Sequence, residues 1–481
     1  MENLKGTKIM ALLCFLFVLF VPTAQVSAEQ PIEEKLNNYI ENYLKEYRVP
    51  GASVAIVQNG KIFYTKSWGV TGESEQPVNS ETPFTIGSIS KSLTGLGIMK
   101  LINENVIELD DPVQKYIPWF TLEDQQASAQ ITIKHLLTHT SGISTYAGLA
   151  ISDKESNDTD AIKNNVKSLS NVKLTAPIGV KHQYSNANFL ILGALIEEVT
   201  DQSFAEFMEQ NVFVPLEMKN AGADRDSAYS KGYLSGYQSW FGYPRKSSVA
   251  YDNSGAPYGY ITASVEDMIQ YIKFISKQDF NHYLNEENMN LYGTPHIQTG
   301  EDRYYGLGIR ISNPDSKDEM LWHSGSTPDS HAELFYLPET DLGGVILTNK
   351  NNVLEEEGLY YLKFGMINIL NGKEPVDIPE NTPTIQLVTI LFICLLFGLF
   401  IYLMMSAKSN KIYIYKKGLL RVAGVTLFGF SIGLIPLLIY SVRSPWHTIS
   451  VFSPDLSLLT IITAVILALN GLLSIKISFE K

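Results

Sequence analysis

Residues 84–91 read FTIGSISK, and an apolar helical pattern follows from Leu93 to Leu101. This arrangement predicts that Ser88 lies at the N-terminus of a helix. Lys91 follows three residues later, and side chains at this spacing share a helix face, so its amine can reach the Ser88 hydroxyl. The unpaired backbone N–H groups at the start of a helix can also polarise an acyl oxygen. The pattern therefore indicates an activated serine nucleophile.

A serine and a lysine at this spacing are also common on solvated helix faces, so the S-x-x-K pattern gains weight only with further motifs. Residues 182–188 read HQYSNAN and precede an apolar helical pattern from Phe189 to Val199. They contain a Tyr-x-Asn pattern at Tyr184 and Asn186. Residues 322–326 read WHSGS and lead into a β-rich region, where the glycine would let an acyl chain approach the backbone.

The motifs S-x-x-K, Y-x-N and H-x-G, in this order, resemble those of the serine β-lactamase and D,D-peptidase superfamily, nearest its class C and esterase-like branch. The resemblance covers residues 33–350. Shorter matches strengthen it, namely VPG at 49–51, LLTHTSG at 136–142 and TAS at 262–264 with Asp267. The resemblance implies a serine hydrolase related to penicillin-binding proteins and β-lactamases.

The resemblance also implies catalytic roles. Ser88 would be acylated, Lys91 and Tyr184 would share the proton transfers, and Asn186 would position the amide of the substrate. Proton transfer at neutral pH requires either a neutral Lys91 or an ionised Tyr184. The pKa of one of these groups must therefore be shifted by its surroundings.

The H-x-G motif would supply a substrate-binding strand made of His323, Ser324, Gly325 and Ser326. His323 stands where many members of the superfamily have lysine. The oxyanion hole of the superfamily would here be built from the backbone N–H groups of Ser88 and Ser326. Such donors stabilise the negative charge that develops on the carbonyl oxygen.

The sequence departs from the superfamily after this motif. Residues 326–331 read STPDSH, where relatives commonly have glycine near Asp329. Two interpretations follow. Asp329 and His331 either shape the substrate pocket, which makes Asp329 a further substrate-binding candidate, or satisfy a turn, as Pro-Asp-Ser usually does.

Neither a metal site nor a cofactor is predicted. His135 and His139 have the spacing of a zinc pair, but the glutamate of H-E-x-x-H is missing and the superfamily motif accounts for residues 138–142. The two cysteines, Cys14 and Cys394, both lie in apolar segments. We therefore expect no disulfide and no thiol nucleophile.

The predicted fold class is α+β. Two β-rich runs joined at Asn59-Gly60 indicate a hairpin near the N-terminus, and a second pair occupies residues 332–348. Helix-like stretches dominate residues 85–275 between them. We expect an antiparallel sheet made from the N- and C-terminal strands, flanked by helices and joined to a mostly helical subdomain. The resemblance implies a β-lactamase/transpeptidase-like fold with Ser88 between the two parts.

The two ends of the chain indicate export and membrane insertion. Residues 1–28 combine early lysines, an apolar run and the small-residue ending Val26-Ser27-Ala28, which predicts a signal peptide. Three apolar runs at 385–405, 419–440 and 456–475 are long enough to be transmembrane helices. Residues 29–381 would form the catalytic domain between them.

The charge distribution indicates a topology and excludes one class of partner. The link between the first two apolar runs is rich in lysine, which places it in the cytoplasm and the catalytic domain outside a multi-pass membrane protein. The whole chain carries a net charge of −13, so nucleic acid is not an expected partner. The expected partners are the membrane and a small-molecule or peptidoglycan-type substrate.

Three activities share this apparatus: cleavage of D-alanyl peptides in cell-wall metabolism, hydrolysis of β-lactams, and hydrolysis of other D-amino-acid amides or esters. We predict a membrane-anchored extracytoplasmic serine hydrolase that acts through an acyl-enzyme on such bonds. Two alternatives stay open. The three-helix tail resembles that of prodrug-activating peptidases that release an N-acyl-D-asparagine cap in nonribosomal-peptide pathways, although Asn186 does not fit them. A non-catalytic sensor of β-lactams or cell-wall fragments would also use Ser88.

Overall fold

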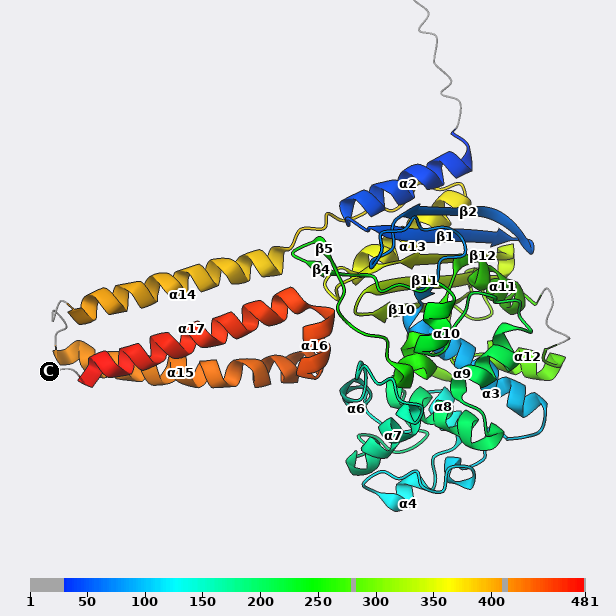
Figure 1. Cartoon of the computed structure of the whole chain (residues 1–481), viewed down its shortest axis with the longest axis horizontal. Helices are drawn as coiled ribbons and strands as arrows, with labels where there is room; N and C mark the ends of the chain where they lie inside the picture. The colour runs from blue at the N-terminus through cyan, green and yellow to red at the C-terminus, as the bar shows by residue number, and fades with distance from the viewer. Residues whose placement is uncertain (1–29, 278–282, 409–413, 480–481) are drawn as a thin grey trace, which may run out of the picture.

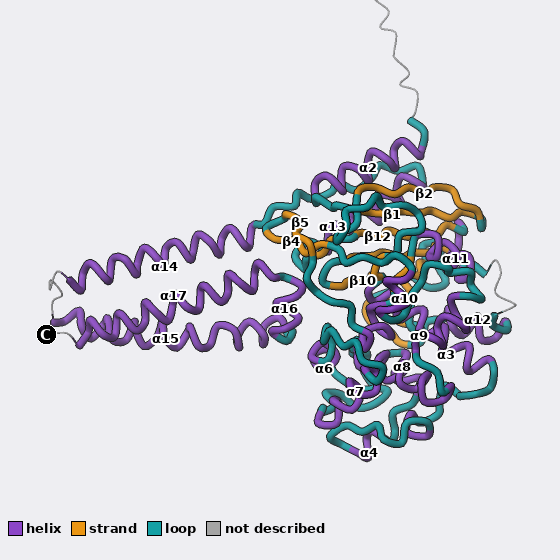
Figure 2. The backbone as a smooth tube through the Cα atoms, viewed as in Figure 1, coloured by secondary structure: helices purple, strands orange, loops and turns teal. Residues whose placement is uncertain are grey.

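The computed structural model describes residues 30–277, 283–408 and 414–479. The predicted signal peptide at 1–28 lies outside these residues and stays a prediction. Figure 1 shows two parts, a body that contains the strands and a tail of long helices that projects from it. Figure 2 shows that the strands are confined to the body, whereas the tail is helical.

The body is built on an eight-stranded antiparallel sheet in which early and late strands are neighbours. Its order is β2-β1-β12-β11-β10-β9-β8-β7. The strands are β1 (Gly51–Gln58), β2 (Lys61–Gly69), β7 (Ile297–Gly300), β8 (Arg303–Tyr305), β9 (Arg310–Ser312), β10 (Met320–Thr327), β11 (Ser330–Leu337) and β12 (Leu342–Thr348). Asn59 and Gly60 both have positive φ, as a two-residue turn between β1 and β2 requires. The predicted sheet of N- and C-terminal strands is confirmed.

Helices cover both faces of this sheet. Val54 and Ile56 of β1 belong to one apolar cluster, which includes residues of α2 (Ile32–Glu46) and α13 (Glu356–Leu370). Ala55 and Val57 belong to the other cluster, on the side of the helical subdomain. This alternation follows from the two-residue period of a strand.

The second apolar cluster joins the sheet to a mostly helical subdomain. Its central helix is α8 (Asn186–Thr200), which is buried without a break from Ala187 to Ile196. The other helices of the body are α3 (Ser90–Asn103), α4 (Gln125–Ser128), α5 (Ile133–Leu137), α6 (Thr145–Ala150), α7 (Ala161–Lys167), α9 (Phe204–Met208), α10 (Arg225–Ser230), α11 (Val265–Ile275) and α12 (Glu286–Gly293). The short strands β3 (Phe84–Thr85) and β6 (Thr262–Ala263) pair beside α3, and β4 (Tyr237–Trp240), β5 (Tyr243–Lys246) and β13 (Lys350–Asn351) form a small sheet. The α+β class with a helical subdomain is confirmed.

The tail comprises α14 (Thr384–Lys408), α15 (Ile414–Val442), α16 (Trp446–Phe452) and α17 (Pro454–Phe479). Three segments in it are long and apolar enough to cross a membrane, namely Thr384–Ala407, Lys417–Val442 and Pro454–Phe479. They contain the three predicted spans. The short helix α16 was not predicted, and it lies where the tail meets the body (Figure 1).

Candidate active site

Ser88 is held in a tight turn against strand β10. It follows β3, and its turn begins with Gly87 at φ +53°, a conformation that favours glycine. A Cβ atom on Gly87 would lie 2.2 Å from the backbone nitrogen of Ser326, and one on Gly325 would lie 1.9 Å from the Ile86 carbonyl oxygen. Both glycines are therefore needed for the close approach of this turn to β10.

The approach brings together the two backbone N–H groups expected to form an oxyanion hole. The nitrogen of Ser88 would be 2.9 Å from a Cβ on Gly325, and that of Ser326 lies against Gly87. A hydrogen bond of 2.9 Å between the Thr85 and Thr327 hydroxyls fixes β3 to β10. The two donors thus belong to a rigid contact, as stabilisation of an oxyanion requires.

Lys91 is the candidate general base for Ser88. Its Nζ lies 3.0 Å from the Ser88 Oγ and donates a 2.7 Å hydrogen bond to the Tyr258 carbonyl oxygen. The side chain is fully buried. Burial, and secondarily the positive charge of Arg310, hold the pKa of Lys91 well below its usual range. Both effects shift the equilibrium toward the neutral amine, which is the form that can accept the Ser88 proton.

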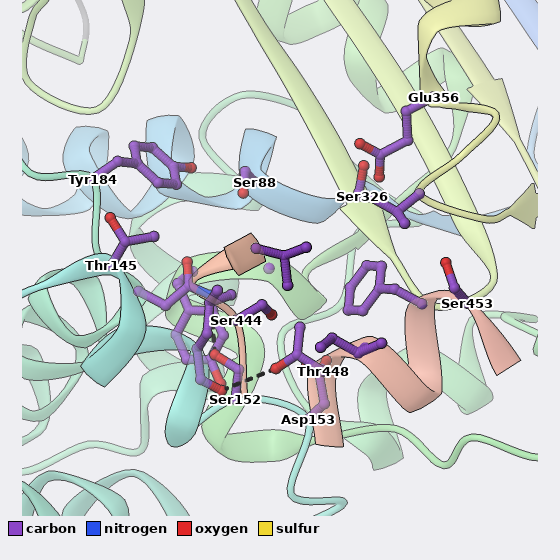
Figure 3. A pocket seen from close by; sticks show the side chains of 18 of the residues that line it. Ser88, Thr145, Ser152, Asp153, Tyr184, Ser326, Glu356, Ser444, Thr448 and Ser453 are labelled. Atoms are coloured by element: carbon purple, nitrogen blue, oxygen red, sulfur yellow. Dashed lines mark hydrogen bonds between the residues drawn. The ribbon is translucent and has the colours of Figure 1, made fainter. Parts of the chain in front are cut away.

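Tyr184 lies beside Lys91, whose Nζ is 4.8 Å from the centroid of the Tyr184 ring. Figure 3 shows its hydroxyl pointing toward Ser88. Burial raises the pKa of Tyr184, while the Arg310 charge and, to a smaller extent, the Ser88 hydroxyl lower it. Among the described residues, the Tyr184 hydroxyl has no well-formed hydrogen bond, which leaves it for a substrate. The opposite pKa shifts favour Lys91 as proton acceptor and a protonated Tyr184 as donor.

Four of the predicted residues line one cavity of about 430 Å³: Ser88, Tyr184, Asn186 and Ser326. Asn186 opens α8 and donates a 3.0 Å hydrogen bond from Nδ2 to the Ser152 hydroxyl. The S-x-x-K, Y-x-N and H-x-G motifs therefore meet around a single space of the size that small-molecule sites have.

Comparison with known proteins shows the family to which the chain belongs. The family model described as Beta-lactamase matches residues 36–363. The chain belongs to the beta-lactamase family. It is 28% identical to Protein flp of Staphylococcus aureus (strain MW2) over 339 residues, which are 70% of this chain and 67% of the relative. It is 27% identical to a Beta-lactamase of Escherichia coli (strain K12) over 361 residues, which cover 68% of this chain and 90% of the relative.

Among solved structures, the chain is similar to the octameric penicillin-binding protein homologue from Pyrococcus abyssi. The two share 27% sequence identity with a TM-score of 0.61, over 72% of this chain and 78% of the other. The body thus has the beta-lactamase family fold, and the tail helices come after the residues that the family model matches.

His323 differs in character from the lysine that many beta-lactamase family members have at this place. It is buried, and its pKa is held well below its usual range by burial and then by the positive charge of Arg310. Its Nδ1 lies 2.7 Å from the Ser324 carbonyl oxygen and therefore carries the proton. Its Nε2 then accepts from the Tyr305 hydroxyl at 3.3 Å. His323 is thus neutral, and it is not among the described residues that line the cavity.

Asp329 is not brought to the cavity by the structure. Its carboxylate accepts hydrogen bonds from the Gly236 backbone N–H at 3.0 Å and from the Thr327 hydroxyl at 3.3 Å. Burial raises the pKa of Asp329. His331, nearby, lies 3.8 Å from Glu333. These contacts favour the turn interpretation over a role in shaping the pocket, because the carboxylate is occupied in joining the β10–β11 turn to a neighbouring loop.

Arg310 is a further residue of the site that the sequence analysis did not predict. It begins β9, and its guanidinium carbon lies 5.1 Å from the Tyr184 ring centroid and 5.4 Å from that of Trp322. Arg310, and not residue 323, therefore supplies a positive charge beside Tyr184. No local pattern marks this arginine, because only the pairing of β9 with β10 brings it to the site.

His139, for which no metal role is predicted, packs against the ring of Tyr184 with 4.4 Å between centroids. Its Nδ1 faces the Asn188 amide at 2.9 Å and the Ser185 backbone N–H at 3.2 Å. Both donors come from the segment that carries Tyr184 and Asn186. His139 therefore holds the Y-x-N segment in position.

Proposed function

We propose that this protein is a membrane-anchored serine hydrolase that acts through an acyl-enzyme on D-amino-acid peptide, amide or ester bonds. The observation that carries the proposal is the buried Lys91 amine, 3.0 Å from the Ser88 Oγ and with a strongly lowered pKa. A serine next to a neutral amine is a nucleophile with its base in place. Membership of the beta-lactamase family supports the hydrolytic class.

Acylation would proceed in two steps. The Ser88 Oγ forms a bond to the substrate carbonyl carbon while its proton passes to the Lys91 amine. The carbonyl oxygen takes up negative charge at the N–H groups of Ser88 and Ser326, donors of a kind that lower the barrier by about 3 kcal/mol each. The bond to the leaving group then breaks as that group takes the Tyr184 proton, and the Lys91 ammonium reprotonates Tyr184. Water releases the acyl group by the reverse sequence.

The location proposed for this chemistry is the outer face of the membrane. The adjoining ends of α14 and α15 and the link between them carry Lys408, Lys411, Lys416, Lys417 and Arg421. The sequence between α15 and α17 carries Arg443 as its one lysine or arginine. Basic links face the cytoplasm. The body and α16 would then lie together on the opposite side, where peptidoglycan-type substrates occur.

The proposal is tested with the full chain in lipid nanodiscs. Wild type, Ser88→Ala and, as a control, the exposed serine variant Ser230→Ala are incubated with a fluorescent penicillin and with D-alanyl, N-acyl-D-asparaginyl and ester substrates. Mass spectrometry locates any adduct. Turnover that is lost only in Ser88→Ala supports the hydrolase and identifies its substrate class. A stable adduct on Ser88 without turnover of any substrate supports the sensor instead, and the absence of both overturns the assignment.

A further inference from the structure

The cavity at Ser88 is not closed by the body alone. Its lining includes residues from α15, α16, α17 and their connections: Leu438, Val442, Ser444, Thr448, Ile449, Phe452, Ser453 and Leu456. Figure 3 shows Ser444, Thr448 and Ser453 across the pocket from Ser88 and Tyr184. The end of the tail that meets the body therefore forms one wall of the cavity at Ser88.

A buried carboxylate fastens this wall to the body. Asp455, at the start of α17, is fully buried. It accepts hydrogen bonds from the Phe241 backbone N–H at 2.9 Å, from the Asn352 amide at 3.3 Å and from Gln386 of α14 at 3.0 Å. One side chain thus joins two tail helices to two loops of the body.

Contacts of α16 complete the junction. The Val353 backbone N–H donates to the Phe452 carbonyl oxygen at 3.0 Å, and His447 Nε2 donates to the Asp153 carbonyl oxygen at 2.7 Å. Both Val353 and Asp153 line the cavity themselves. The hydrogen bonds therefore set the distance between the two walls.

The wall that the tail supplies is mainly apolar. Leu438, Val442, Ile449, Phe452 and Leu456 face the cavity together with Leu149, Val353 and Leu354 of the body. Lysine and arginine are absent from the described residues of this lining. One of its two carboxylates, that of Asp153, already accepts a 2.6 Å hydrogen bond from Tyr260. Such a lining favours hydrocarbon over a charged peptide.

The wall is also continuous with the candidate membrane spans. Leu438 and Val442 lie at the end of the span Lys417–Val442, and Leu456 lies at the start of the span Pro454–Phe479. A molecule inserted in the membrane at this level would have its polar end beside the body. The cavity therefore connects Ser88 with the depth at which the hydrocarbon of a lipid begins.

We propose that Ser88 acts on an amphiphilic substrate, in which the scissile bond belongs to a polar head and a hydrocarbon chain lies against α15, α16 and α17. The inference deepens the proposed function and rests on it. The cavity of about 430 Å³ takes the head and the first part of the chain. Transfer of each methylene from water strengthens binding by about four-fold, so burial of even four methylenes gives a preference of about 100-fold or more.

The first test compares chain lengths on one scissile bond. N-acetyl- and N-dodecanoyl-D-alanyl-4-nitroanilide are hydrolysed by the full chain in nanodiscs, and the matching N-acyl-D-alanines compete with a fluorescent penicillin for Ser88. We expect the dodecanoyl compounds to be at least about 30-fold better substrates or competitors. A ratio below about three in both measurements overturns the inference while leaving the hydrolase intact. Absence of hydrolysis and of Ser88 labelling at every chain length overturns the proposed function itself.

The second test narrows the cavity beside the wall that the tail supplies. Ile449→Trp and Val442→Trp place a large ring where the chain would lie, and Val465→Trp places the same ring on the exposed face of α17 as a control. We expect the first two to lower the dodecanoyl-to-acetyl ratio of kcat/KM at least about ten-fold, and Val465→Trp to leave this ratio unchanged. An equal loss on both substrates in both variants, with Val465→Trp normal, would mean that the tail supports only the shape of the site and would overturn the inference.

Discussion

The two walls of the cavity at Ser88 are built in different ways. The body wall consists of backbone segments in such close contact that Gly87 and Gly325 admit no side chain, and it buries the titratable groups Lys91 and Tyr184. The tail wall consists of apolar side chains held at a distance by hydrogen bonds to Asp455 and α16. A rigid wall of backbone suits bond breaking, and an apolar wall suits selection of the group to be bound. Changes in the first should affect all substrates, and changes in the second only those with a chain.

The largest effect is expected at the base. Lys91→Met should lower kcat/KM by about 100- to 10,000-fold for every chain length, because the Ser88 proton loses its acceptor. The same variant should be more stable than wild type at neutral pH. The pKa of Lys91 is lowered in the folded state, so folding must release a proton there, and wild-type stability rises with pH up to the unfolded pKa of about 10.4.

The measurements for this variant are initial rates and thermal unfolding midpoints between pH 6 and pH 9. Lys100→Met, further along α3 in an ion pair with Glu104, serves as the control and should keep its activity. A Lys91→Met protein that retained activity with the acetyl substrate would exclude Lys91 as the base. A lower unfolding midpoint would contradict the neutral amine.

A smaller effect, again independent of chain length, is expected at the contact between the nucleophile turn and β10. Gly325→Ala places a Cβ 1.9 Å from the Ile86 carbonyl oxygen, so the strand must move away from Ser88 and the oxyanion donors separate. We expect a loss of about 100-fold in kcat and a destabilisation of about 1–3 kcal/mol. Gly293→Ala, where a Cβ would meet nothing within 4 Å, is the matched control. Equal kinetics for the two alanine variants would refute the proposed oxyanion hole.

The tail wall should respond differently. Asp455→Asn replaces one acceptor oxygen by a donor that faces other donors, which should weaken docking of the tail by about 1–3 kcal/mol. Turnover of the dodecanoyl substrate should fall several-fold, turnover of the acetyl substrate should change little, and hydrogen exchange should increase at residues 446–456. Asp318→Asn, on an exposed loop, provides the control. Unchanged exchange at 446–456 would show that Asp455 does not hold the wall.

Local sequence signals account for the body wall. Asn59-Gly60 marks the β1–β2 hairpin of the sheet, and the three-residue spacing of Ser88 and Lys91 places both on one turn of chain that then becomes α3. Y-x-N and H-x-G were recognised from the residues themselves, and the fold brings Tyr184, Asn186 and Ser326 to the same cavity. These features are short-range patterns that survive in a sequence without knowledge of long-range contacts.

The tail wall could not be predicted in the same way. The three apolar runs indicate helices that cross a membrane, but nothing local shows that the seven residues of α16 contact a site whose nucleophile lies more than 350 positions earlier. Arg310 is similar, because its place beside Tyr184 depends on strand pairing. For Asp329, the sequence left a turn and a role in the pocket equally possible, and the hydrogen bonds from Gly236 and Thr327 favour the turn.

The smallest effect is expected at Arg310, and it separates the two causes of the lowered pKa of Lys91, which are burial and the charge of Arg310. Arg310 lowers the pKa of Lys91 and of Tyr184, so Arg310→Met should raise both. Activity requires a neutral Lys91, and the acid limb of the pH profile of kcat/KM should therefore move to higher pH, with a loss of several-fold at neutral pH. Arg310→Lys should restore much of the wild-type profile, and Arg303→Met, on the neighbouring strand β8, should leave it unchanged. A limb that stays in place, or that moves to lower pH, would mean that the charge of Arg310 does not act on Lys91 and that burial alone keeps the amine neutral.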